Sequence, residues 1–564
     1  MPPTGSRNPW TLLAAATAFL LPVAYSPSVF ATFWSPKAAV LLVAGGFGLA
    51  RLPVLLRSPL RRPTIAALAF LAVATLSTLV SPDRTAALVG LYNWGTGLVF
   101  VACLVGVWAL GASVGDDTRL VRHALLAGIG ASCAIAVLQA MVDLGLPALE
   151  ANGRTTGLAG NPVHLGAVAA AGVALCAAGS GWGSLAAVLG FTAAAQLSGT
   201  RLAIAVILVA VVVIGLRGGM RRLVPLVVVA AVGLGVGSAL AGSAGVQTAT
   251  SRSTERAFDA ASGGGVRVRL EVWAYARHAV LDRPLLGSGP GRFRAATSAD
   301  RTLPVVRAEG SQSIYADGHN LVVEYAVTTG IIGVLALLWW VVGALRLARG
   351  PLAAAALVLL AISLGQPQSV GTTPLLFLAA GAGASRLVER RASSPRPGLL
   401  LGLVGSIAAL ALLVGDASLL RLHDDFDLRD GRRADALLHA WPKPASLLAD
   451  AHTFEAIREP DPSARAVDER VARDWARTAV ARDRADPSLW LNLAEDERVA
   501  GLLDDATTHY REALRRDHYS VGALVGLGRV AVARHDNGAA VAWFSRAVAI
   551  RANPRLSALI DQLR

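Results

Sequence analysis

The sequence predicts an all-α protein that consists of a polytopic helical membrane domain of about 12 to 13 spans, a large extracytoplasmic loop and a C-terminal α-solenoid. Of its 564 residues, 54% are hydrophobic and only 16% are charged, and the mean hydropathy is +0.53, which excludes an ordinary soluble chain. Residues 1–419 hold 30 Lys and Arg against 15 Asp and Glu, whereas residues 420–564 hold 22 against 23. An internal repeat with a period of 34 is visible in this second part. We therefore expect a membrane domain over 1–419 and a soluble tail over 420–564.

Helical spans come first, because a bilayer core ~30 Å thick takes about 20 apolar residues of helix. Thirteen apolar runs approach that length. They lie near 10–30, 36–52, 63–81, 88–111, 119–141, 161–178, 183–198, 201–216, 223–242, 320–345, 351–366, 372–385 and 398–416. The first run could instead be a cleaved signal peptide, but only Arg7 precedes it and further spans follow at once.

The orientation follows from the basic residues in the connections. With the N-terminus in the cytoplasm, the inside connections hold sixteen Arg, whereas the short outside connections hold only Lys37, Arg84, Arg154 and Arg201. The long loop and the tail are then extracytoplasmic. Membrane topology thus explains the pI near 10.7, and we expect no nucleic-acid partner. The three cysteines lie inside apolar runs without metal-ligand spacing, so neither a disulfide framework nor a zinc site is predicted.

The long outside loop, about 243–319, contains ten Arg against seven acidic residues. Within it, Val266 to Leu281 has helical character and brings Arg269 and Trp273 one turn apart on a shared face. A glycine-rich run follows, with Gly287, Gly289 and Gly291. This run could be a phosphate-binding nest, but it lacks the Lys-Ser/Thr of a P-loop, so a tight turn is the favoured interpretation.

The tail repeats its pattern of small and large residues. Trp490, Leu493, Ala494, Ala506, Tyr510 and Ala513 recur one period later as Leu524, Leu527, Gly528, Ala540, Phe544 and Ala547. The pattern resembles tetratricopeptide helix pairs, in which small residues allow close packing. Generic amphipathic hairpins are the alternative. We expect the tail to recruit or position a partner, for which a protein is one candidate, and to carry no catalytic residue.

Several residues that can bind anions or move protons fall on the predicted outer side. Arg154 precedes the sixth span and Arg201 begins the eighth, and either one alone could be an interfacial arginine. His319, in the segment Asp317-Gly-His319-Asn320, could likewise be only a helix cap. Together they offer guanidinium groups that suit phosphate and an imidazole that suits removal of a hydroxyl proton.

These motifs resemble the O-antigen ligase and polymerase superfamily of bacterial envelope enzymes. The similarity covers roughly residues 60–390, and its core is Arg269-x-x-x-Trp273, the glycine-rich turn ending at Phe293, and His319-Asn320 followed by Gly330-x-x-Gly333. The resemblance implies a multi-pass protein of the bacterial inner membrane. It also implies a metal-independent transfer of a glycan from an undecaprenyl-pyrophosphate-linked donor to a hydroxyl of a lipid, glycan or protein acceptor, with no cofactor.

The resemblance also assigns roles to residues. His319 and Arg269 would be catalytic, and Arg154, Arg201 and Arg269 would bind the donor pyrophosphate. The supporting residues would be Trp273, Gly287, Gly289, Gly291, Asp317 and Asn320. Ligase, polymerase and protein O-oligosaccharyltransferase all remain open. A transporter or flippase for an anionic lipid, and a non-enzymatic envelope scaffold, are the alternatives of other classes.

Overall fold

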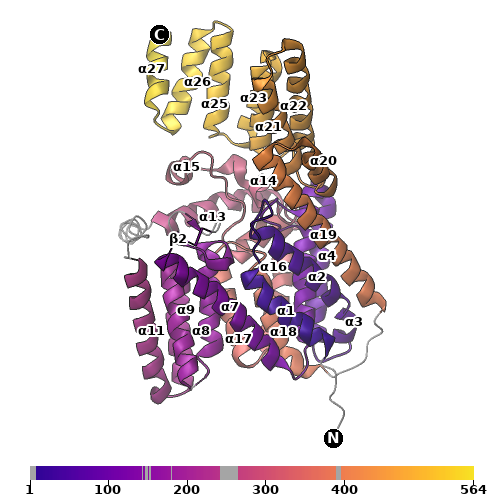
Figure 1. Cartoon of the computed structure of the whole chain (residues 1–564), viewed down its shortest axis with the longest axis vertical. Helices are drawn as coiled ribbons and strands as arrows, with labels where there is room; N and C mark the ends of the chain where they lie inside the picture. Colours follow the sequence, from indigo (N-terminus) through magenta and orange to yellow (C-terminus); the bar gives the residue numbers. More distant parts are fainter. Residues whose placement is uncertain are drawn as a thin grey trace.

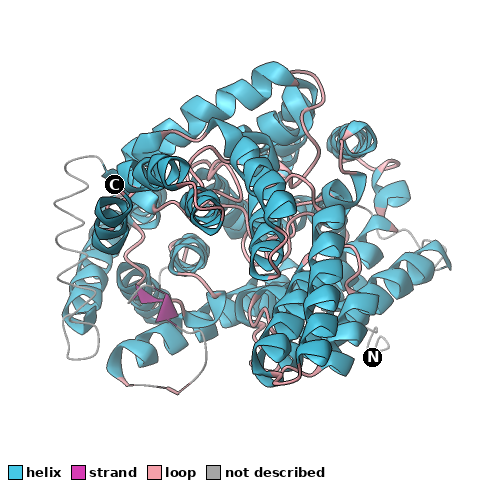
Figure 2. Cartoon of the chain, turned by 90° about the horizontal axis from the view of Figure 1, so that it is seen from above, coloured by secondary structure: helices cyan, strands magenta, loops and turns pink. Residues whose placement is uncertain are grey.

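The computed structural model describes residues 8–142, 144–145, 150–151, 154–179, 181–241, 264–388 and 396–564. These residues are almost wholly helical. A short antiparallel hairpin, β1 (Glu150–Ala151) and β2 (Arg154–Thr155), lies toward one edge in the view from above (Figure 2). The all-α prediction therefore holds for the described chain.

Within the described ranges, a helix lies at each of the thirteen predicted apolar positions. These helices are α1 (Pro9–Val23), α2 (Trp34–Leu49), α4 (Arg61–Val80), α6 (Leu98–Ala112), α7 (Thr118–Met141), α8 (Pro162–Cys176), α9 (Trp182–Leu197), α10 (Arg201–Arg217), α11 (Met220–Ala241), α16 (Leu321–Leu347), α17 (Gly350–Ser363), α18 (Thr373–Ala384) and α19 (Arg396–Asp425). By length and composition, five described helices can cross a membrane: α4, α7, α11, α16 and α19. A polytopic membrane protein is supported, and the count of 12 to 13 spans stays a prediction.

Some boundaries differ from the sequence prediction. Helix α1 ends at Val23 rather than near residue 30, because Pro27 disfavours the helical conformation of the residue before it. Helix α6 begins at Leu98 rather than 88, after a turn in which Asn93 has a φ of +63°. Helix α19 continues to Asp425, so the boundary expected between 419 and 420 falls inside one helix.

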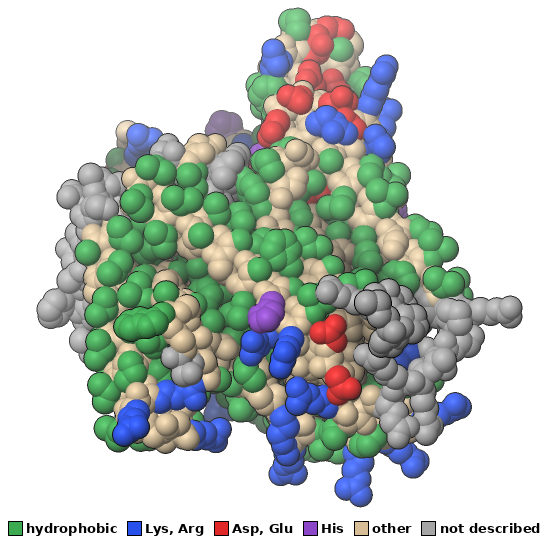
Figure 3. All heavy atoms as spheres, turned by 60° about the horizontal axis from the view of Figure 1, so that its bottom comes forward, with side chains coloured by type: hydrophobic (Ala, Val, Ile, Leu, Met, Phe, Trp, Pro, Cys, Tyr) green, Lys and Arg blue, Asp and Glu red, His purple; other side chains and the backbone are tan. Residues whose placement is uncertain are grey.

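The surface of the helical bundle suits a lipid environment. Large apolar side chains are exposed along α10, α11, α16 and α19, for example Val209 at 63% and Leu410 at 64%. Hydrophobic side chains spread over the side of the bundle, while Lys and Arg gather at the end away from the tail (Figure 3). By the positive-inside rule, that basic end is the expected cytoplasmic side.

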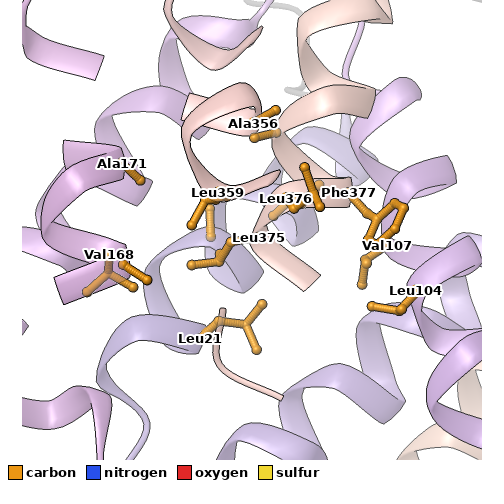
Figure 4. Packing of buried hydrophobic residues seen from close by; sticks show 14 of the residues in the cluster. Leu21, Leu104, Val107, Val168, Ala171, Ala356, Leu359, Leu375, Leu376 and Phe377 are labelled. Carbon is orange, nitrogen blue, oxygen red and sulfur yellow. The ribbon is translucent and has the colours of Figure 1, made fainter. Parts of the chain in front are cut away.

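The interior of the bundle is held by close helix approach. Apolar side chains of α1, α6, α8, α17 and α18 pack together in one buried cluster (Figure 4). Gly48 and Gly106 allow α2 and α6 to touch, since a Cβ on Gly48 would lie 1.9 Å from the Gly106 carbonyl oxygen. Likewise, a Cβ on Gly381 of α18 would lie 2.2 Å from the Trp108 carbonyl oxygen of α6. Lipid gives helices no hydrophobic reason to associate, so such van der Waals contact is what holds them together.

The described part of the loop between α11 and α16 consists of helices joined by turns. It contains α13 (Gly264–Asp282), as the sequence predicts, followed by two short helices, α14 (Phe293–Thr297) and α15 (Leu303–Glu309). Residues 242–263, the first part of the predicted loop, lie outside the described residues. Helices α13 to α15 lie between the bundle and the tail (Figure 1).

The tail is a row of antiparallel helices. They are α20 (Leu428–Leu437), α21 (Lys443–Arg458), α22 (Pro462–Arg482), α23 (Pro487–Val499), α24 (Leu503–Arg516), α25 (Val521–Ala533), α26 (Asn537–Ile550) and α27 (Pro554–Leu563). Helices α25 and α26 begin and end exactly one sequence period after α23 and α24. Tyr510 and Phe544 are buried at equivalent positions, and a Cβ on Gly528 would lie 2.2 Å from the Phe544 ring. The period therefore reflects real helix pairs, while a tetratricopeptide assignment stays a proposal.

Arginines of the loop form ion pairs with aspartates of the tail. Arg292 makes two hydrogen bonds with Asp483, of 3.0 and 3.1 Å, and Arg301 donates to Asp517 at 2.9 Å. Asp483 and Asp517 are one sequence period apart and follow equivalent helices, α22 and α24. All four side chains are buried, with exposures between 1% and 8%. Equivalent positions of successive repeats in the tail thus bind arginines of the loop. Sequence analysis did not predict this intramolecular contact.

Candidate active site

Arg154 and Arg201 lie close together beside the start of α10. In β2, Arg154 donates through Nε to the Ser198 carbonyl oxygen at 2.8 Å and through Nη2 to the Thr200 hydroxyl at 3.2 Å. The Thr200 hydroxyl in turn donates to the Pro162 carbonyl oxygen, at the start of α8. Arg154 therefore ties the hairpin to the α9–α10 turn, and Arg201, the first residue of α10, is exposed next to that turn.

Arg269 and Trp273 lie one turn apart on α13, as predicted, and both bond to backbone carbonyl groups. Arg269 Nη1 donates to the Gly365 carbonyl oxygen at 2.8 Å, and Trp273 Nε1 donates to the Gly318 carbonyl oxygen at 2.8 Å. Burial lowers the pKa of the Arg269 guanidinium, an effect that the nearby Tyr315, Asp317 and Glu309 oppose. A guanidinium stays protonated in any case, so Arg269 keeps a positive charge beside the Gly365 carbonyl group.

The glycine-rich run is a tight turn packed against α16. Gly287, Gly289 and Gly291 all have positive φ, of +66°, +108° and +69°. The Gly289 amide donates to the Thr328 carbonyl oxygen at 2.9 Å, and the Gly287 amide donates to the Arg283 carbonyl oxygen within its own turn. These amides are therefore engaged by protein carbonyl groups, which argues against a phosphate nest.

The same turn explains a break inside α16. Gly330 has a φ of +68°, and a Cβ at this position would lie 2.3 Å from the Leu285 carbonyl oxygen. The Ile331 amide reaches out of the helix to the Pro284 carbonyl oxygen at 2.9 Å. The glycine-rich turn thus takes over a backbone bond that α16 would otherwise make, and it fixes the loop against the bundle.

His319 is held by the buried carboxylate of Asp317. His319 Nδ1 lies 2.7 Å from Asp317 Oδ1, and the same oxygen accepts the His319 backbone amide at 2.9 Å. His319 has a φ of +48°, which is strained for a non-glycine residue, and its side chain is 22% exposed. Asp317 itself is fully buried. This arrangement orients the imidazole, and it leaves Nε2 as the nitrogen available to a substrate.

Asn320 does not orient the imidazole ring of His319 but caps a helix. Its Oδ1 accepts the amides of Val322 and Val323, which caps the start of α16, and its Nδ2 donates to the Leu364 carbonyl oxygen. Asp317, and not Asn320, is therefore the partner of the imidazole. Glu324, one turn into α16, is also buried and accepts the Gly318 amide at 3.0 Å.

The candidate residues meet at the connection between α17 and α18. Arg269 bonds to Gly365, Asn320 bonds to Leu364, and the Gln368 amide donates to Asp317 Oδ2 at 2.8 Å. Leu202, which follows Arg201, lies so near Gly365 that a Cβ there would be 2.8 Å from it. Residues 364–368 thus bring together elements that are far apart in the sequence. Sequence analysis treated this connection only as a link between spans, because it carries no charged residue.

The fold and this cluster define a helical membrane protein with a histidine, a buried carboxylate and several arginines on the side that faces the tail. Residues 185–338 match a family model described as O-Antigen ligase. The match spans roughly a quarter of the chain, from α9 to the middle of α16, and includes Arg201, Arg269 and His319 but not Arg154. No curated protein matches the chain. The similarity supports a glycan-transferring envelope enzyme of the ligase or polymerase kind.

Proposed function

We propose that this protein transfers a glycan from an undecaprenyl-pyrophosphate-linked donor to a hydroxyl acceptor on the outer side of the bacterial inner membrane. The observation that carries the proposal is the Asp317–His319 pair, joined at 2.7 Å and partly open to solvent, within a segment that matches the O-Antigen ligase family model. Ligase action is our first choice within that family. Polymerase and protein O-oligosaccharyltransferase action share the same chemistry with a different acceptor.

His319 is the general base. An acceptor hydroxyl attacks the anomeric carbon slowly while it keeps its proton, and an oriented imidazole can remove that proton through Nε2. Asp317 holds Nδ1 and so fixes the ring and its tautomer, in the way a carboxylate supports a histidine base in other enzymes. The new bond forms between the acceptor oxygen and the anomeric carbon, and the bond to the pyrophosphate oxygen breaks.

The arginines stabilise the leaving group. Pyrophosphate gains negative charge as the glycosidic bond breaks, and guanidinium groups can neutralise it without a metal ion. Arg269 bonds to Gly365 of the α17–α18 connection, and Leu202, the residue after Arg201, lies beside the same glycine, which supports a joint role of the two arginines. Arg154 already bonds to the α9–α10 turn, so we assign it to positioning that turn as well as to donor binding.

The test is transfer by purified full-length protein with lipid-linked donor and acceptor. Removal of a general base costs roughly 10²- to 10⁴-fold in rate, so we expect His319→Gln to lose transfer by this factor and still bind donor. His278 provides the matched control, since it is a second loop histidine, 53% exposed and 3.6 Å from Asp300. We expect His278→Gln to transfer at the wild-type rate.

The outcomes separate the alternatives. If His319→Gln transfers glycan at the wild-type rate, His319 is not the base and the mechanism fails. If the wild-type protein moves donor across vesicles but forms no glycoside with any acceptor, the transporter alternative is correct. In cells, loss of a ligase leaves long unattached polymer, whereas loss of a polymerase leaves single repeat units, so glycan analysis of a deletion strain distinguishes these two activities.

A further inference from the structure

A cavity of about 230 Å³ lies next to the candidate site, and none of the residues proposed above as catalytic or donor-binding lines it. Its walls come from four connections on the side of the tail: the segment before α2, the turn before α6, the start of α8 and the segment before α18. Gln368 lines the cavity, and its backbone amide bonds to Asp317. The cavity and the candidate base therefore share a wall.

The cavity is lined by a buried lysine that has no carboxylate partner among the described residues. Lys37 is the one lysine among residues 1–419 and is only 2% exposed. Its Nζ donates to the carbonyl oxygens of Ala24 and Leu158, both at 2.7 Å, so one of its three protons is left over. Within the described ranges, no carboxylate forms a salt bridge with Lys37. Because a buried charge is costly unless it is paired, an anionic group in the cavity would stabilise it.

Three residues that line the same cavity each carry a further buried polar nitrogen. Trp94 Nε1, His164 Nε2 and Gln368 Nε2 are all buried, and none has a hydrogen-bond partner among the described residues. Indole and amide nitrogens are donors only, and the imidazole nitrogen can be one. Buried polar groups in folded proteins almost always have a hydrogen-bond partner. Several unpartnered donors on the residues around one cavity therefore indicate a ligand rich in oxygen acceptors.

The size and the apolar part of the wall limit the ligand further. The volume lies below the about 300–1,000 Å³ of pockets that enclose drug-sized molecules, so it suits one small ring. The aromatic rings of Phe33, Trp34 and Trp94 also line the cavity and can pack on the C–H face of such a ring. A bare phosphate ion would use the donors but not these aromatic faces.

From this arrangement we propose that the cavity binds one monosaccharide unit that carries an anionic group, a carboxylate or a phosphate. The biological role of this subsite rests on the proposed function, because the sugar would belong to the donor or acceptor glycan next to His319. Binding itself does not depend on transfer. Lys37 would pair with the anionic group, while Trp94, His164 and Gln368 would donate to ring or substituent oxygens.

The test is saturation-transfer NMR on purified full-length protein with four probes: glucuronate, glucose 6-phosphate, glucose and inorganic phosphate. We expect both acidic sugars to bind, glucose to bind at least tenfold more weakly, and inorganic phosphate not to displace the acidic sugars at equal concentration. Lys37→Met should weaken acidic-sugar binding roughly 10- to 100-fold, as expected for a hydrogen bond to a charged group. Trp94→Phe keeps an aromatic ring and removes the indole N–H donor, so we expect about fivefold weaker binding.

The controls keep the proposal falsifiable. If Lys37→Met does not fold, Trp94→Phe decides the matter. Absence of binding by either acidic sugar, equal binding of glucose, complete displacement by phosphate, or unchanged binding in the folded variants would each overturn the proposal. His319→Gln should bind the acidic sugars like the wild type. Loss of transfer in that variant without acidic-sugar binding by the wild type would leave the proposed function standing and remove only the subsite.

Discussion

Replacing Arg301 by Met should weaken the docking of the loop on the tail, because the change leaves Asp517 buried without its partner. The pair is almost completely buried, with side-chain exposures of 1% and 3%, and its Nη1–Oδ2 distance is 2.9 Å. Removing one member of a buried ion pair costs roughly 3–5 kcal/mol, whereas replacing both with apolar residues is often neutral. We therefore expect Arg301→Met to destabilise the docked loop by about 3 kcal/mol, and the double variant Arg301→Met/Asp517→Leu to recover most of that loss.

Hydrogen exchange of the full-length protein measures this directly. A loss of about 3 kcal/mol corresponds to roughly a hundredfold faster exchange for amides protected by docking. The amides of α15 are the ones to follow, since this helix starts two residues after Arg301. Arg307→Met is the matched control, because Arg307 is exposed and its one hydrogen bond to a described residue goes to the Ala549 carbonyl oxygen in the tail, at 3.0 Å.

Two results would refute the reasoning. If Arg301→Met exchanges no faster than Arg307→Met, the Arg301–Asp517 pair does not hold the loop. If the double variant is as unstable as the single one, the loss comes from packing rather than from the unpaired buried charge.

Docking of the loop on the tail also changes what we expect from removal of the tail. Because the sequence places no catalytic residue in the tail, it predicts that removal of the tail reduces activity in cells more than activity with purified substrates. The two buried ion pairs predict a large loss with purified substrates as well, because the loop that carries Arg269 and His319 would lose its support.

Three further predictions concern separate parts of the chain. Arg269→Lys keeps the charge but loses the planar guanidinium group, so we expect weaker binding of lipid-linked donor, and still weaker binding in Arg269→Ala. The control, Arg277→Lys, changes an exposed residue of α13 and should bind normally. Normal binding by Arg269→Ala would exclude the pyrophosphate role. Burial raises the pKa of Asp496 from 3.8 to about 7, so between these two pH values the folded tail holds a proton there that the unfolded chain lacks. The stabilising effect of this proton should be lost as the pH rises from about 4 to about 7, and Asp496→Asn should flatten this dependence in thermal unfolding. Ala540→Arg would bring a charge into a fully buried contact and should cost roughly 3 kcal/mol or more, whereas Ala542→Arg at an exposed position of the same helix should not change the unfolding temperature.

Local sequence pattern determined much of the fold. The apolar runs predicted helices at thirteen positions, because a span depends on the length and composition of one continuous segment. The period of 34 predicted the equivalent helix pairs of the tail, since small residues must recur wherever helices touch. The helix from Val266 to Leu281 was visible in the same way, and it closely matches α13.

The candidate site was only partly visible in the sequence. Arg269 and Trp273 stood out because they lie one turn apart on one face of a predicted helix, and His319 because an imidazole suits removal of a hydroxyl proton. Asp317 and Asn320 are both within two residues of His319, so the sequence does not decide which of these two supporting residues orients the imidazole. Their distances decide the matter: Asp317 Oδ1 contacts the imidazole at 2.7 Å, while Asn320 caps a helix.

Other features depended wholly on the tertiary structure. The meeting of Arg269, Asn320 and Asp317 at residues 364–368 joins segments 44 to 96 residues apart, and the Arg301–Asp517 pair joins residues 216 apart. The isolation of Lys37 in a cavity is also invisible in the sequence, where the residue is only one of four basic residues in short outer connections. Periodicity and composition report what a segment does with its own neighbours. Which distant side chains share a wall, a charge or a hydrogen bond is set by how the helices pack, and only the folded chain fixes that packing.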